Sequence, residues 1–214
     1  MPIAESSLVY HRDNAAYSLN DRRNISPIDG NGSDVIPRFF MAFDGGQLST
    51  SARLRQALID QLELAIDLIG RLDDELYSAS KDGCGTVGAH LRHNINFVEA
   101  ILDGAMSGVI DYATRTRDRR IETERSFASW KLRSMIEALE KVPMDLAEPM
   151  TVISEIDPKL RHRSTLGREL EFVVSHTVHH FALIKERLEG DGIEFDKRLG
   201  VAPSTLEYWK ASGQ

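Results

Sequence analysis

Histidine is the residue type in this sequence whose spacing carries the clearest chemical signal. Five of the seven histidines fall in two short stretches of the 214-residue chain. His176 and His180 are four residues apart, so on a helix they project from one face, about 6 Å apart along the axis. Two imidazoles in this relation can bind one metal ion at roughly 2.1 Å per bond. His93, on another predicted helix, can add a third imidazole if the two helices are neighbours, and the ion would keep open positions for water or a substrate.

Simpler interpretations of these histidines stay open. A histidine on a helix is usually a capping or solvated residue, and a pair four residues apart also occurs by chance. The histidines could instead titrate at an interface, because imidazole changes its charge near neutral pH. No glutamate follows His176, which disfavours the H-E-x-x-H pattern of zinc proteases. His179 lies around 100° from His180 on a helix and is not expected to bind metal.

The elements that must position these residues are helices. Apolar residues recur at steps of three and four in four segments, which is typical of amphipathic helices. We expect one helix from about Ser51 to just before Gly83, and others at about 86–102, 122–141 and 165–189. Gly104 and Gly108 are expected to end the second helix, and Pro143 the third. A short helix is expected at 204–210.

One segment departs from the helical pattern. β-branched residues are frequent between positions 149 and 157, which suits a strand better than a helix. A small β-hairpin within 149–165, before the last long helix, is therefore predicted. Four long amphipathic helices and little strand predict an all-α protein with a four-helix bundle.

The first 48 residues have no sustained apolar period and are rich in Ser, Asn, Asp, Gly and Pro. We therefore expect residues 1–48 to form an irregular extension and residues 49–214 to form the helical domain.

Composition narrows the range of partners. The chain has 26 Lys and Arg against 33 Asp and Glu, a net charge of −7, which argues against nucleic acid as the main partner. A single cysteine, Cys84, excludes an internal disulfide and any multi-cysteine metal site. No signal peptide and no run of eighteen apolar residues is found, so we expect no membrane segment and a cytoplasmic protein.

Two histidine segments carry a resemblance to a known family. VGAHLRHNINFVEAIL (87–102) and GRELEFVVSHTVHHFALI (167–184) resemble the DinB/YfiT-like superfamily of four-helix-bundle proteins. The resemblance covers about residues 50–206, including YATRTRD (112–118) and GVAPSTL (200–206). It implies a divalent-metal site made by His93, His176 and His180. His90 lies one turn before His93 and either supports a ligand or replaces His93 as one.

The resemblance also implies a function. We expect a metal-dependent enzyme, a thiol-dependent transferase or a hydrolase, acting on a small molecule and using a low-molecular-weight thiol in the first case. Three imidazoles favour zinc or nickel over iron or manganese, and the ion would lower the pKa of a bound water or thiol. No other residue is a convincing general base, so the catalytic residues stay unknown.

The alternative is a non-catalytic metal-binding or stress-related bundle that acts as a binding or scaffold module. The long amphipathic helices and the resemblance also suggest a homodimer.

Charged residues near the predicted site leave two questions open. Four arginines crowd the loop before the third helix: Arg115, Arg117, Arg119 and Arg120. They either hold a carboxylate or phosphate of a substrate or form a solvated loop paired with acids. Glu169 lies seven residues before His176 on the same helical face. It either orients a ligand imidazole or pairs with the loop arginines.

Overall fold

Four long helices pack together in the part of the chain that the computed structural model describes, residues 49–80 and 85–213. All of these residues belong to one of the two units into which the chain divides, Phe43–Gln214. The long helices are α1 (Thr50–Arg71), α3 (Val87–Ser107), α5 (Arg125–Lys141) and α6 (Leu166–Arg187). The expected irregular segment 1–48 lies outside the described residues.

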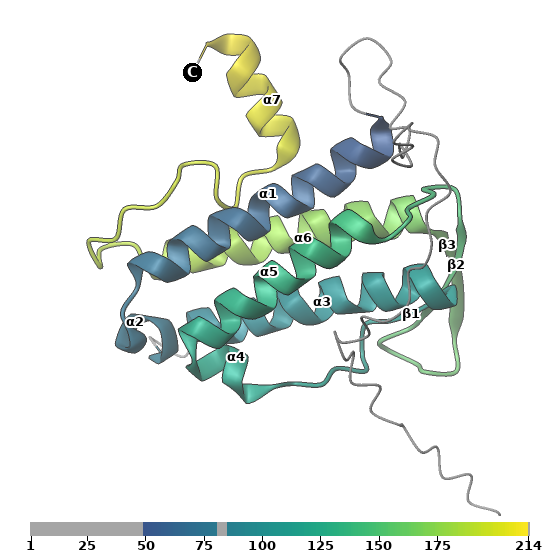
Figure 1. Ribbon diagram of the computed structural model, residues 1–214, viewed down its shortest axis with the longest axis horizontal. Helices are drawn as coiled ribbons and strands as arrows, with labels where there is room; N and C mark the ends of the chain where they lie inside the picture. Colours follow the sequence, from purple (N-terminus) through teal and green to yellow (C-terminus); the bar gives the residue numbers. More distant parts are fainter. Residues whose placement is uncertain (1–48, 81–84, 214) are drawn as a thin grey trace, which may run out of the picture. The chain divides into compact units, whose positions relative to one another are not determined.

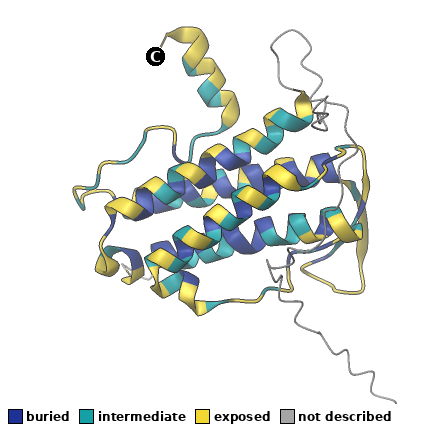
Figure 2. Cartoon of the chain, viewed as in Figure 1, coloured by how far each residue is buried: buried dark blue, intermediate teal, exposed yellow. Residues whose placement is uncertain are grey.

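Each long helix buries its apolar face against two others. The contacting pairs are α1 with α5 and α6, and α3 with α5 and α6 (Figure 1). The buried residues follow the predicted steps of three and four, and the inward faces of the helices are the buried ones in Figure 2. On α1, for example, Leu58, Leu62, Ala65 and Ile69 are all at most 2% exposed. The contact between α3 and α6 brings the two histidine segments together.

A small sheet accompanies the helices. β1 (Val109–Asp111) pairs in parallel with β2 (Pro149–Ile153), which pairs in antiparallel with β3 (Arg161–Thr165). In register, Ile110 lies opposite Val152, and Val152 lies opposite His162. The predicted hairpin is therefore present, but the expected all-α class is too narrow. The described chain is mostly helical with a three-stranded sheet, because β1 adds a strand that its short sequence did not reveal.

Three predicted helix boundaries are wrong. The first helix ends at Arg71, and the Asp73 carboxylate accepts a hydrogen bond from the Leu76 backbone N–H and so begins the separate helix α2 (Asp74–Ser78). The third predicted helix is interrupted at Glu124, which separates α4 (Arg119–Thr123) from α5. The second continues through Gly104 and ends only at Gly108, whose φ of 74° gives the left-handed end of a helix. The short C-terminal helix is α7 (Pro203–Ser212).

Two glycines allow α3 to approach its neighbours closely. A Cβ atom on Gly88 would lie 2.2 Å from the backbone oxygen of Glu122 in α4, and one on Gly104 would lie 2.3 Å from Cγ1 of Ile110 in β1. Both positions therefore require the absence of a side chain. These contacts fix the helix that carries His90 and His93.

Among the described helices, none has the length and apolar character needed to cross a membrane.

Candidate metal centre

The three predicted ligands come from two packed helices. His93 lies on α3, and His176 and His180 lie on α6, whose first turn is capped by the Thr165 hydroxyl accepting from the Arg168 N–H. Val173 and Thr177 of α6 are buried, and the histidines beside them are half-buried. The helical period thus places the imidazoles at the edge of the core, where a small molecule can reach them.

The structure brings these three imidazoles together. One ring nitrogen of each lies within 4.8 Å of the others, a grouping that can hold a metal ion. Nε2 of His93 is 2.8 Å from Nε2 of His176. The ring centroids of His93 and His180, and of His176 and His180, are each 4.6 Å apart. The set predicted from spacing therefore converges on one point between α3 and α6.

His90 contacts the cluster without joining the group of three. Its Nδ1 lies 2.9 Å from Nδ1 of His180, so one of the two rings donates to the other. When His180 donates, its Nε2 keeps a lone pair, and this is the nitrogen that a metal can bind. Of the two alternatives for His90, this geometry favours support of a ligand. His179 is exposed, with its ring centroid 5.3 Å from that of His180.

Burial keeps the imidazoles uncharged. It lowers the pKa of His93 to about 4 and that of His180 to about 3, with further lowering by the neighbouring histidines and, for His93, by Arg115. The pKa values of His176 and His90 are also lowered, mainly by burial. A metal ion needs the neutral form of histidine, so the cluster is in the ligating form at neutral pH.

An aromatic wall holds one side of the cluster. The Phe97 ring stacks on His176, with centroids 4.1 Å apart and planes at 21°. The Phe97 ring also stacks on the Tyr112 ring, with centroids 4.9 Å apart and planes at 16°. Phe172 adds an edge contact to Tyr112. These rings restrict the orientation of His176 and shield its apolar face from water.

Arg115 is the loop arginine that reaches the histidines. Its Nη1 donates to Nδ1 of His93 at 3.2 Å, its Nη2 donates to Oε1 of Glu155 at 2.6 Å, and its Nε donates to the Tyr112 carbonyl oxygen at 2.7 Å. Arg120 instead pairs with Asp118, and Arg117 and Arg119 are exposed. The arginine cluster therefore divides into one site residue and a solvated loop.

Glu169 takes neither of its two predicted roles. Its carboxylate is 3% exposed and accepts hydrogen bonds from Tyr112, Ser164 and its neighbour Arg168. Burial and the charge of Glu169 raise the pKa of Tyr112, which stays protonated and donates. Glu169 thus ties the first turn of α6 to β3 and to the residue after β1.

Glu155 and Tyr112 are site residues that the sequence did not reveal. Glu155 follows β2 in the hairpin, and Tyr112 follows β1. Neither has a spacing relation to a histidine, because the sheet rather than one helix brings them to the cluster.

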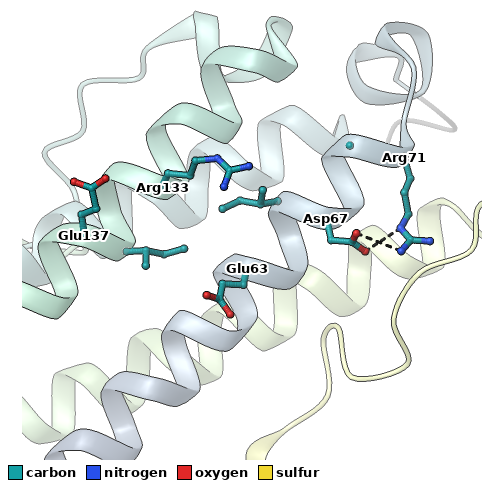
Figure 3. A pocket seen from close by; sticks show the side chains of 8 residues that line it. Glu63, Asp67, Arg71, Arg133 and Glu137 are labelled. Atoms are coloured by element: carbon teal, nitrogen blue, oxygen red, sulfur yellow. Dashed lines mark hydrogen bonds and ion pairs between the residues drawn. The ribbon is translucent and has the colours of Figure 1, made fainter.

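Two cavities differ in their relation to the histidines. One of about 440 Å³ is lined by Tyr112, Glu155 and Phe172, which adjoin the cluster. A larger one of about 810 Å³ lies between α1 and α5, where Asp67 pairs with Arg71 and no histidine is present (Figure 3). The histidine cluster is the stronger candidate site, since lowered pKa values and converging ring nitrogens occur there.

Comparisons with known proteins leave the family of this chain open. No family model matches the sequence, and no solved structure matches it. A protein named FK506-binding protein 5 from Rhizopus delemar is 32% identical over 109 residues. The matched region is 48% of this chain and 28% of that protein, so the chain spans less than a third of that relative's length.

Proposed function

We propose that this chain is a DinB/YfiT-like four-helix-bundle protein that binds one divalent metal ion through His93, His176 and His180. The observation that supports this most is the convergence of three neutral imidazoles from α3 and α6 within 4.8 Å. The pairwise packing of four long helices supports the bundle, and the short sheet is an addition to it.

The donor set fits zinc or nickel, which imidazole nitrogen suits well. A bound ion of this kind would supply Lewis acidity, lowering the pKa of a bound water or thiol. The chain itself contributes the half-buried setting, the stacking of Phe97 on His176 and the hydrogen bond between His90 and His180. We infer from this chemistry a thiol-dependent transferase or a hydrolase that acts on a small molecule.

Metal content of single variants tests the site. Wild-type protein exposed to zinc at about pH 8, where imidazole is neutral, is expected to hold one ion per chain by elemental analysis. His93→Ala, His176→Ala and His180→Ala should each lose most of it. His179→Ala is the matched control on the same helix and should keep it. An empty wild-type protein would contradict the metal site.

His90 has a separate expected outcome. Removal of a group that orients a metal ligand typically weakens metal binding about 10–100-fold. His90→Ala should therefore bind zinc more weakly in a chelator competition while still filling at high zinc. If His90→Ala is empty and His93→Ala is filled, His90 is the ligand from α3.

Activity distinguishes the enzyme from the binding module. A panel of electrophiles should be assayed with a low-molecular-weight thiol, and in parallel for hydrolysis without one. Turnover that chelator abolishes and zinc restores supports the enzyme. Metal-loaded protein that turns over no compound supports the non-catalytic module.

A further inference from the structure

A cationic group contacts the histidine cluster directly, because Nη1 of Arg115 lies 3.2 Å from Nδ1 of His93. Arg115 is paired with Glu155, and Arg92, the residue before His93, is paired with Glu122. A divalent ion bound by uncharged imidazoles would add two positive charges with no carboxylate among its ligands. An anion at the open positions would therefore be favoured electrostatically.

Arg115 has hydrogen-bond donors to offer such an anion. A guanidinium has five N–H groups and accepts no hydrogen bond, and Arg115 uses three of its own on His93, Glu155 and the Tyr112 carbonyl oxygen. When His93 binds an ion through Nε2, its ring proton lies on Nδ1. Arg115 can then no longer donate to that nitrogen, and its Nη1 group becomes available to a ligand.

The guanidinium is also held in place before any ligand arrives. Glu155 and the Tyr112 carbonyl oxygen bind two of its three nitrogens, and its Cζ lies 5.3 Å from the centroid of the Phe97 ring. The side chain is 21% exposed, so it is partly desolvated but open to a small molecule. A prearranged, partly desolvated guanidinium suits the two oxygens of a carboxylate.

Space for the rest of a ligand lies next to two residues that contact Arg115. The cavity of about 440 Å³ is lined by Glu155 and Tyr112, which hold Arg115, and by the aromatic Phe172. Its volume is in the range of small-molecule sites. Two arginines, Arg163 and Arg168, and two carboxylates line it, and both carboxylates accept hydrogen bonds from donors of the chain, Glu155 from Arg115 and Glu169 from Tyr112, Ser164 and Arg168.

We propose that Arg115 binds a carboxylate of the small-molecule ligand and makes the site selective for anionic over neutral ligands. This rests on the proposed metal-dependent function, whose substrate class it specifies. Arg115 is thus a binding residue that contacts the ligand beside the metal.

Cobalt-loaded protein gives a direct test, because thiolate binding to cobalt(II) produces a characteristic absorption. The probes are mercaptoacetate, which carries a thiol and a carboxylate, and 2-mercaptoethanol, which carries the thiol alone. Wild type is expected to bind mercaptoacetate at least about tenfold more tightly, the size of one charge-assisted hydrogen bond. Arg115→Gln should lose most of that preference, keep its affinity for 2-mercaptoethanol and keep one cobalt per chain. Arg117→Gln, a change to an exposed arginine of the same loop, is the matched control and should keep the preference.

Each other result overturns the proposal. An unchanged preference in Arg115→Gln would show that the carboxylate binds cobalt directly. Loss of cobalt from Arg115→Gln would show that Arg115 maintains the histidines instead. Equal affinities in wild type would show that the site does not select anions. Wild type that takes up no cobalt would remove the proposed function itself, which elemental analysis distinguishes from the other outcomes.

Discussion

The imidazoles of His93 and His180 link the candidate site to the stability of the fold. Their folded pKa values of about 4 and about 3 lie below the ordinary value of 6.5. At pH values between 6.5 and these lowered pKa values, the two histidines bind more protons in the unfolded chain than in the folded chain. The contribution of these two histidines to the free energy of unfolding is therefore complete above about pH 6.5 and is lost as the pH decreases, down to about 4 for His93 and about 3 for His180.

This pH dependence can be measured by urea denaturation with chelator present at about pH 7.5 and about pH 5, on either side of the ordinary histidine pKa. The double variant His93→Gln/His180→Gln should lose less stability over this interval than wild type, because it has lost two groups that resist protonation. His162→Gln, on the exposed strand β3, is the control and should behave as wild type. Equal losses in wild type and the double variant would contradict the burial of these two imidazoles.

At the scale of elements, the close approach of α3 to α4 gives a second prediction. Gly88→Ala would place a Cβ atom 2.2 Å from a backbone oxygen, which cannot move aside as a flexible side chain does. We expect a loss of about 1–3 kcal/mol in the free energy of unfolding. Gly70→Ala is the matched helical control, since nothing lies within 4 Å of its Cβ position. It should stabilise the protein by up to about 1 kcal/mol, and both changes are measured by urea denaturation.

Helical periodicity predicted the long elements because it reports burial directly. Buried residues recur at the predicted steps, as Leu58 and Leu62 do on α1 and Val87 and Leu91 on α3. The i, i+4 relation of His176 to His180 also places both rings in the cluster. Single residues that usually end a helix predicted the boundaries less well, because tertiary contacts also determine where a helix ends. Gly104 resembles a helix end in the sequence, yet α3 continues through it, and the absence of a side chain there leaves room for Ile110 of β1.

Contacts made through the sheet were not predictable from spacing. β1 has three residues, too few for a period, and its partner in β2 lies about forty positions away along the chain. The positions of Tyr112 and Glu155 follow from this pairing. The sequence therefore indicated the histidines of the site but not the groups that hold Arg115 beside them.

At the scale of the whole molecule, the helical domain is expected to be independent of the N-terminal segment. Deletion of residues 1–45 should leave a protein that unfolds cooperatively and binds one zinc ion per chain, because that segment lacks the apolar period of a packed helix. The checks are a thermal denaturation curve and elemental analysis of the truncated protein. A gradual unfolding curve, or loss of zinc with an intact fold, would contradict this.

The outer strand of the sheet bears on how copies of this chain meet. In the described residues β3 pairs with β2 along one edge alone, and it carries Arg161, His162 and Arg163 in succession after Lys159 in the preceding turn. An unpaired edge invites strands from other molecules, and charged side chains along it oppose such pairing. Two copies meeting edge to edge would bring like charges together. The charges along β3 thereby oppose the addition of a strand from another molecule at this edge of the sheet.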